Sequence, residues 1–319
     1  MAIARSLIHK QGTFSADLKP LAEMYKRAIL ELNMRAKARL ISDGRVLTSE
    51  AHRARILARE ASVILERLDA DAAQWIAENV PKAYLRGVKD AGFGLTEIGA
   101  SVGVPQPLIH EEAIQLLVDD LQDTMEDMTR QIARGVRRTI RRTQLTGTLD
   151  KLVTENIAQG IISGRTRRET SNAIRRQLID EFGEKPIRIG ARNYQIDSYA
   201  EMVARTKTAE AQTAGMINRL AEEGHDLVMI TAHGAKDGCG YYEGKVFSIS
   251  GNSEKYPALA SVPNGGPPFH PNCRHAAVPY VEELSSRSEK RRARGVPSEA
   301  LGKSYAEVEK LAKQARRAA

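Results

Sequence analysis

The sequence predicts a mainly α-helical protein in which long helical N-terminal and middle regions are followed by a small α+β C-terminal module and a basic tail that is helical or disordered. Aromatic residues make up 5% of the 319 residues and charged residues 28%. Ala, Leu, Ile, Arg and Glu are abundant. All of these except Ile form helices more readily than sheets. Apolar residues also recur every three or four positions over long stretches before the last third of the chain, as in amphipathic helices.

The first two helices are predicted to form an antiparallel hairpin. Ser15 is a good N-cap for the first helix, which continues until Asp43-Gly44 provides a stop. The second helix begins after Thr48-Ser49 and carries one apolar face as far as Trp75. Residues 81–107 contain prolines and several glycines, so we expect a short helix there, followed by a loop or hinge at a domain boundary.

The best-patterned helix spans Ile109–Ile140. Its first half is rich in Asp and Glu and its second half in Arg, a polarity that matches the helix dipole. The basic half is a candidate nucleic-acid surface, although an Arg-rich helix end is more often a solvated or protein-facing surface. The arginines in question are Arg134, Arg137, Arg138, Arg141 and Arg142.

The following segments shorten and become mixed in type. A capping box at Thr166–Glu169 predicts a helix that runs to Gly183. We expect a strand within Ile187–Ile196, a helix over Tyr199–Glu223 and two buried strands, at Leu227–Thr231 and Lys245–Ile249. The predicted organisation is a helical hairpin region (1–104), a long-helix middle region (105–185), an α+β module (186–284) and a basic tail (285–319).

The net charge is +8, and about six of these units lie after Ser285. A basic tail of this kind is typical either of a solvated or disordered end or of contact with nucleic acid. Its candidate DNA-binding residues are Arg291, Arg292 and Arg294. No apolar run is long enough to cross a bilayer and the chain has two cysteines, so we expect a cytosolic setting without a membrane partner.

Three of the seven histidines and both cysteines lie in the interval 233–275. Thiolate and imidazole are the ligands that zinc prefers, and four of them could hold together a loop-rich module with a small core. The alternative is a buried Cys273 with histidines that bond to the backbone of turns. The Cys-x-His spacing is tighter than that of most zinc sites. The candidate ligands are Cys239, His270, Cys273 and His275, with His233 as a substitute.

A catalytic interpretation has less support. Cys273 could act as a nucleophile with His270 or His275 as its base, but such partners usually come from distant segments. The sequence has neither a phosphate-binding Gly-Lys-Ser/Thr loop nor a His-Glu-x-x-His motif. We therefore predict a non-enzymatic protein. Arg205 either has a plain surface and packing role or pairs with Asp or a chain carbonyl near the terminal cluster, which would join its helix to that loop.

Several motifs of the last third together resemble the minor capsid proteins of tailed bacteriophages, which are related to the MuF-like head-morphogenesis proteins. These proteins commonly carry a Cys-x-x-Cys and a later Cys-x-Cys, whereas Tyr242 and His275 replace one cysteine of each motif here. A site with four thiolates is thereby excluded. The matching motifs are Ala204–Ala209 leading to Gly215, Glu243–Gly251, Tyr256-Pro257, Pro271–His275 and Pro279-Tyr280.

The resemblance implies a virion component that is bound at the portal vertex inside the phage head and is present in host cytoplasm during assembly. It implies a role in head morphogenesis, DNA packaging or ejection, with the portal protein or the major capsid protein as partner. Packaged DNA and several copies around a symmetric vertex are further expectations. The alternatives are a phage-delivered enzyme, a nuclease or an ADP-ribosyltransferase-like protein, and a non-specific DNA-binding protein. For a transferase, only Glu307-x-Glu309 in the tail resembles part of the expected residue set.

Overall fold

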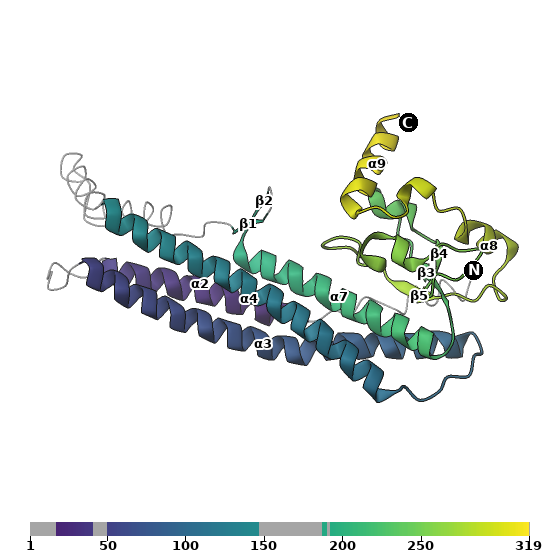
Figure 1. Ribbon diagram of the computed structural model, residues 1–319, viewed down its shortest axis with the longest axis horizontal. Coiled ribbons are helices and arrows are strands. Elements are labelled where there is room, and N and C mark those ends of the chain that lie inside the picture. Colours follow the sequence, from purple (N-terminus) through teal and green to yellow (C-terminus); the bar gives the residue numbers. More distant parts are fainter. Residues whose placement is uncertain (1–16, 41–49, 147–186, 190–191, 319) are drawn as a thin grey trace. The chain divides into compact units, whose positions relative to one another are not determined.

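The computed structural model describes residues 17–40, 50–146, 187–189 and 192–318. Most of these residues are helical, and a small three-stranded sheet lies in the C-terminal region, which confirms the predicted fold class (Figure 1). The predicted helix from Thr166 to Gly183 lies outside the described residues. The principal helices are α2 (Lys19–Leu40), α3 (Glu50–Glu97), α4 (Pro107–Thr146) and α7 (Ile196–Glu222).

The chain divides into two compact units. Of the described residues, unit 1 contains 17–18, 76–121 and 202–318, and unit 2 contains 19–40, 50–75, 122–146, 187–189 and 192–201. The helices α3, α4 and α7 each contribute residues to both units. The predicted division into four consecutive regions stays a prediction, because each compact unit combines separate stretches of the chain and does not test boundaries along it.

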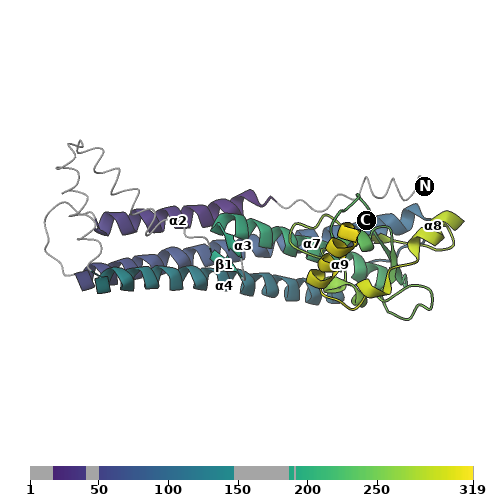
Figure 2. The ribbon, with the colours of Figure 1, turned by 90° about the horizontal axis from the view of Figure 1, so that it is seen from above.

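Unit 2 contains a bundle formed by α2, the first part of α3 and the second part of α4. Figure 2 shows α2 running beside α3 and α4. The apolar spacing noted in the sequence forms the bundle core, in which Tyr25 is fully buried and its hydroxyl lies 3.5 Å from Met125 Sδ. The other buried core residues include Leu21, Leu32, Leu57, Ala61, Ile64, Leu68, Met128 and Ile132.

The loop predicted within residues 81–107 is present at residues 98–106, but the predicted separate short helix before it is wrong. Helix α3 continues through Pro81 and ends at Glu97. Gly99, at φ +79°, closes the helix, since its amide donates to Thr96 O and the next amide donates to Leu95 O. Residues 98–106 then lead to α4.

The sheet of unit 1 has the strand order β4-β3-β5, with both neighbours antiparallel to β3. The strands are β3 (Leu227–Ile230), β4 (Val246–Ser248) and β5 (Ala277–Pro279). The predicted strands at β3 and β4 are confirmed. The sequence did not indicate β5, which has three residues and ends in a proline. Proline is tolerated there because β5 is an edge strand.

Residues 187–196 were predicted to contain one strand. The structure has two, β1 (Ile187–Ile189) and β2 (Arg192–Tyr194), which pair antiparallel with Ile187 opposite Tyr194. Helix α7 then begins at Ile196, three residues before the predicted start. Strands of three residues are too short to show a detectable alternation of apolar and polar residues, so the sequence did not separate them.

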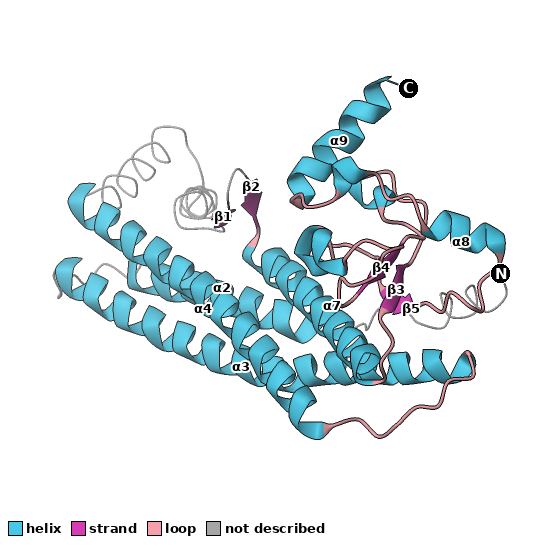
Figure 3. Cartoon of the chain, turned by 45° about the vertical axis from the view of Figure 1, so that its right-hand side comes forward, coloured by secondary structure: helices cyan, strands magenta, loops and turns pink. Residues whose placement is uncertain are grey.

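The core of unit 1 combines residues from distant parts of the chain. Ala91 and Leu95 of α3 pack with Met216 and Leu220 of α7 and with side chains of all three strands. Loops and turns make up most of the chain around these strands, as Figure 3 shows. The module therefore has little regular structure of its own with which to hold its loops.

The C-terminal segment is helical and belongs to this core. Helices α8 (Arg287–Ala293) and α9 (Tyr305–Ala318) follow the sheet, and the capping box at Ser286 and Glu289 starts α8. Ala300 and Val308 are fully buried in the same cluster as β3 and β4. Of the two predicted states of the tail, the helical one is confirmed for the described residues up to 318.

Tyr242→Phe is expected to loosen this C-terminal segment. Tyr242 is fully buried, and its hydroxyl donates to Ala300 O at 2.6 Å. Loss of the donor should lower the free energy of unfolding of unit 1 by about 1–2 kcal/mol. Hydrogen exchange of peptides from residues 300–318 would measure it. Tyr241→Phe, at the partly buried neighbour, is the control; equal exchange in the two variants would contradict the prediction.

Among the described residues, no helix combines the length and the apolar character needed to cross a membrane.

Candidate metal centre

The sheet brings two loops to one end of the module. One loop leaves β3 after Ile230, and the other enters β5 at Ala277; these two residues are paired in the sheet. Two hydrogen bonds extend the pairing: Thr231 N donates to Ala276 O at 2.9 Å, and Ala276 N donates to Thr231 Oγ1 at 3.0 Å. The first loop contains a 3₁₀ turn, η1 (Gly238–Tyr241), which includes Cys239. Because the two loops adjoin paired strands, the candidate ligands on both loops lie near one another.

Three of the predicted ligands form one cluster. Cys239 Sγ, Cys273 Sγ and a ring nitrogen of His275 all lie within 4.8 Å of one another. His275 Nδ1 is 3.3 Å from Cys273 Sγ. Cys239 and His275 are buried, Cys273 is partly exposed, and both cysteines are free thiols. The arrangement places two sulfur atoms and one imidazole nitrogen around a common point.

Glu243 holds the other side of the His275 ring. His275 Nε2 lies 3.0 Å from Glu243 Oε1. The carboxylate of Glu243 also accepts hydrogen bonds from three successive backbone amides, those of His233, Gly234 and Ala235, at 2.9–3.2 Å. His233 stacks on His275 with ring centroids 4.2 Å apart. The orientation of His275 is thus fixed by a carboxylate that is itself held in place.

These contacts shift the pKa values of the side chains in the cluster. Burial alone would raise the pKa of Glu243, but hydrogen bonds from the amides of His233 and Ala235 and from His275 lower it. Burial would lower the pKa of His275, yet Cys273 and Glu243 raise it. The hydrogen bond from Cys239 is the main cause that lowers the pKa of Cys273 to about 4, and the same bond and burial raise the pKa of Cys239.

His270 lies next to this cluster and shares Cys239 with it. One atom each from Asp237, Cys239 and His270 lie within 4.8 Å of one another. His270 Nε2 is 3.4 Å from Asp237 Oδ2, and its Nδ1 is 2.7 Å from Pro271 O. Its ring also stacks on Tyr305, with centroids 4.5 Å apart. His270, the fourth predicted ligand, therefore lies close to Cys239. It does not form a group with Cys273 or His275 in which all ligand atoms lie within 4.8 Å of one another.

The short Cys-x-His spacing is accommodated by a turn. Asn272 has a positive φ of +64°, and Cys273 N donates to His270 O at 3.0 Å, so the chain reverses just before Cys273. Arg205 Nη1 on α7 donates to Asn272 Oδ1 at 2.9 Å. The predicted link between α7 and the terminal cluster is present, but the predicted acceptor is wrong, because the acceptor is the side-chain amide of Asn272 and not Asp or a chain carbonyl.

Sequence reasoning missed the two carboxylates. Asp237 is two residues before Cys239 and accepts a hydrogen bond from Cys239 N, which is a local signal that could have been found. Glu243 lies 32 residues before His275, and only the sheet brings them together. His233, the predicted substitute ligand, forms a third group with Glu243 and His275.

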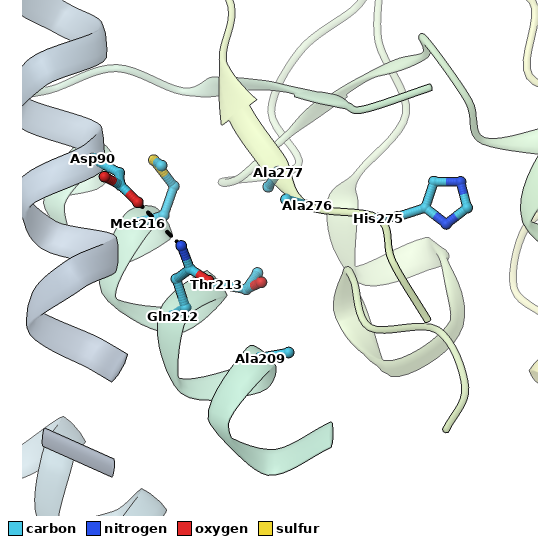
Figure 4. A pocket seen from close by; sticks show the side chains of 8 residues that line it. All are labelled: Asp90, Ala209, Gln212, Thr213, Met216, His275, Ala276 and Ala277. Carbon is cyan, nitrogen blue, oxygen red and sulfur yellow. Dashed lines mark hydrogen bonds between the residues drawn. The ribbon is translucent and has the colours of Figure 1, made fainter. Parts of the chain in front are cut away.

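The same geometry resembles a nucleophile with its base and an orienting acid, because Cys273, His275 and Glu243 follow one another at hydrogen-bond distances. A pocket next to the site is lined by His275 with Asp90, Ala209, Gln212, Thr213, Met216, Ala276 and Ala277. Figure 4 shows the His275 ring pointing away from the Asp90–Gln212 pair of this pocket. Cys273 is not among the residues that line this pocket.

The predicted nucleic-acid residues have different surroundings. Arg134, Arg137, Arg291 and Arg292 are exposed. Arg294 is also exposed, but its Nη2 donates to Glu282 at 2.8 Å and its guanidinium lies 5.7 Å above the Tyr256 ring. The side chains of Arg138, Arg141 and Arg142 lie outside the part of the chain that the structure describes.

Comparison with known proteins identifies the family. The family model described as "Phage minor capsid protein 2" matches residues 48–318, which include most of both units. Searches of curated proteins and of solved structures gave no match. The match confirms the resemblance seen in the sequence motifs, and it indicates a structural protein. The chain therefore belongs to the phage minor capsid protein 2 family and is a component of the bacteriophage virion.

Proposed function

We propose that this protein acts in head assembly at the portal vertex or inner head wall, where it binds the portal protein or the major capsid protein and assists DNA packaging or ejection. Family membership supports the structural role. The observation that carries the binding proposal is a row of exposed apolar side chains. It runs from the segment before α4 into the first turns of that helix, all within unit 1.

The row is unusually exposed for apolar residues. Val104 is 90% exposed, Leu108 75% and Leu116 71%, and Ile109 is also exposed. Leu108 and Leu116 are eight positions apart and therefore lie on the same side of α4. Apolar side chains gathered in this way on a protein surface mark protein contacts more often than scattered single residues do. A partner in the phage head would cover them.

Leu108→Gln combined with Leu116→Gln tests this role. We expect incorporation into phage heads to fall at least about tenfold, because a few desolvated contacts near the centre of an interface carry most of its binding energy. Circular dichroism should remain unchanged, since both side chains are exposed. Glu111→Gln with Glu112→Gln is the control on the same turns of α4, and it should be incorporated normally.

Co-expression with the portal protein or with the major capsid protein, followed by co-purification, would identify the partner. Cryo-electron microscopy of heads would give the location and the copy number. Normal incorporation of the double leucine variant, or absence of the protein from purified heads, would contradict the proposal.

We also propose that packaged DNA contacts exposed arginines of this protein. Arg134 and Arg137 on α4 and Arg291 and Arg292 on α8 are exposed, as such contacts require. Duplex binding by the purified chain should weaken steeply with salt, and replacing Arg291 and Arg292 by Gln should reduce that dependence. Truncation after Ser285 is a poor test, because it removes the buried Ala300 and Val308 as well. Binding that does not change with salt would contradict a role of these arginines.

A further inference from the structure

We propose that the cluster of Cys239, Cys273 and His275 binds one structural zinc ion, with His270 as the fourth ligand. In tetrahedral zinc sites the metal lies about 2.3 Å from sulfur and about 2.0–2.1 Å from nitrogen, which puts a sulfur and a nitrogen ligand about 3.5 Å apart. Cys273 Sγ and His275 Nδ1 are 3.3 Å apart. This pair is thus close to the separation that zinc requires, and Cys239 Sγ lies within 4.8 Å of Cys273 Sγ and of a ring nitrogen of His275.

The surroundings of both histidines match those of metal ligands. A zinc-binding imidazole usually donates its second ring N–H to a carboxylate or a backbone carbonyl. His275 Nε2 faces the Glu243 carboxylate at 3.0 Å, which leaves Nδ1 on the side of the two thiols. His270 Nδ1 faces Pro271 O at 2.7 Å, which leaves Nε2 on the side of Asp237 and Cys239. Each ring therefore directs one nitrogen toward the cysteines.

The fourth position belongs to His270 because it shares Cys239 with the buried cluster. Asp237, the other member of that group, already accepts hydrogen bonds from Cys239 N and faces His270 Nε2. Rotation of His270 about its side-chain bonds would be needed to bring Nε2 to the metal, with Asp237 remaining as a neighbouring acceptor. Zinc would bind Cys239 and Cys273 as thiolates and His275 as a neutral imidazole, and every proton that these groups carry beforehand would pass to solvent.

A metal at this point would join the two loops through their side chains. Cys239 belongs to η1, and Cys273 and His275 belong to the loop that enters β5. The neighbouring Gly238 N donates to Glu309 Oε2 of α9 at 2.7 Å. The ion would therefore hold the two loops together and support the contact with the C-terminal helix.

Metal analysis of the purified full-length chain is the first test. We expect one zinc per chain, and cobalt in its place should give the absorption of a tetrahedral site with thiolate ligands. Both thiols should resist alkylation until a chelator is added. A chain that binds no stoichiometric zinc after reduction and refolding with the metal would overturn the proposal, whether Cys239 and Cys273 are then free or joined in a disulfide.

Variants test the individual roles. Glu243→Gln should weaken zinc binding about 10- to 100-fold, as is typical for loss of a partner that orients a ligand. Glu254→Gln, at an exposed carboxylate, is its control. His270→Gln should alter the cobalt spectrum, whereas His225→Gln, outside the cluster, should not. An unchanged spectrum in His270→Gln would overturn the fourth ligand. The spectrum of the unmodified chain answers the main question even if a variant fails to fold.

Discussion

Gly215→Ala is expected to lower the free energy of unfolding of unit 1 by about 3 kcal/mol, the upper end of the cost of overpacking a core. A Cβ atom at Gly215 of α7 would lie 2.1 Å from Tyr84 O of α3. The contact is reciprocal, since a Cβ at Gly87 of α3 would lie 1.9 Å from Gln212 O of α7. Both contacts are with backbone, so no side-chain rotation can relieve them.

Gly92→Ala is the matched control, because it lies on the same helix as Gly87. Its Cβ would meet only Val102 Cγ1 at 3.7 Å, an ordinary contact. This substitution should stabilise the protein by about 0.5–1 kcal/mol through reduced entropy of the unfolded chain. Hydrogen exchange of peptides from α7 and β3, together with thermal denaturation, would compare the two. If Gly215→Ala proved as stable as Gly92→Ala, the close packing of α3 on α7 would be wrong.

Arg219→Met is expected to destabilise unit 1 by about 3–5 kcal/mol, because it removes one partner of a buried ion pair and leaves the other uncompensated. Arg219 is 1% exposed. Its guanidinium donates to Glu222 and Gly103 O and pairs with Glu223. Glu223 in turn accepts from Gly103 N at 2.9 Å. The arginine therefore links α7 to the segment between α3 and α4.

Arg130→Met provides the control, because Arg130 is about half exposed and pairs with Glu126 and Asp127 on its own helix. We expect a loss of less than about 1 kcal/mol there. Urea denaturation would measure both effects, and hydrogen exchange of residues 98–110 would report on Arg219→Met. Comparable losses in the two variants would contradict the assigned role of Arg219.

The pH dependence gives a second readout for Arg219. Burial alone would raise the pKa of Glu222, but hydrogen bonds from Arg219 and from Gln106 N outweigh it and hold that pKa below its ordinary value. This stabilisation is therefore present above the unfolded-state pKa of 4.5 and is lost as the pH falls through the lower folded pKa. In Arg219→Met the loss on acidification should be smaller, because a buried Glu222 without its partner favours protonation.

The helices could be predicted from the sequence because each repeats one local pattern many times. Local sequence signals did not predict the structure at residues whose role is to contact a distant part of the chain. Gly87 was interpreted as part of a break, whereas it permits the close approach of α7, and only Gly99 ends the helix. Pro81 is accommodated within α3. A propensity for breaking a helix was outweighed by packing.

The candidate site shows the same division. Residue type and proximity in sequence identified the cysteines and histidines. Their grouping depends on the pairing of Ile230 with Ala277, which no spacing reveals. Glu243 reaches His275 through that pairing, and so its role could be seen only in the folded chain.

The order of packing in unit 1 also affects biosynthesis. Residues 76–121 are made early, yet their buried side chains pack against residues after 202, including Val308 in the first turn of α9. During translation, the apolar face of the second part of α3 therefore stays exposed until the rest of unit 1 has been synthesised. Nascent chains that expose such surface are prone to aggregate. We expect production of this protein to depend on chaperones that bind this face until α7 and the sheet have emerged.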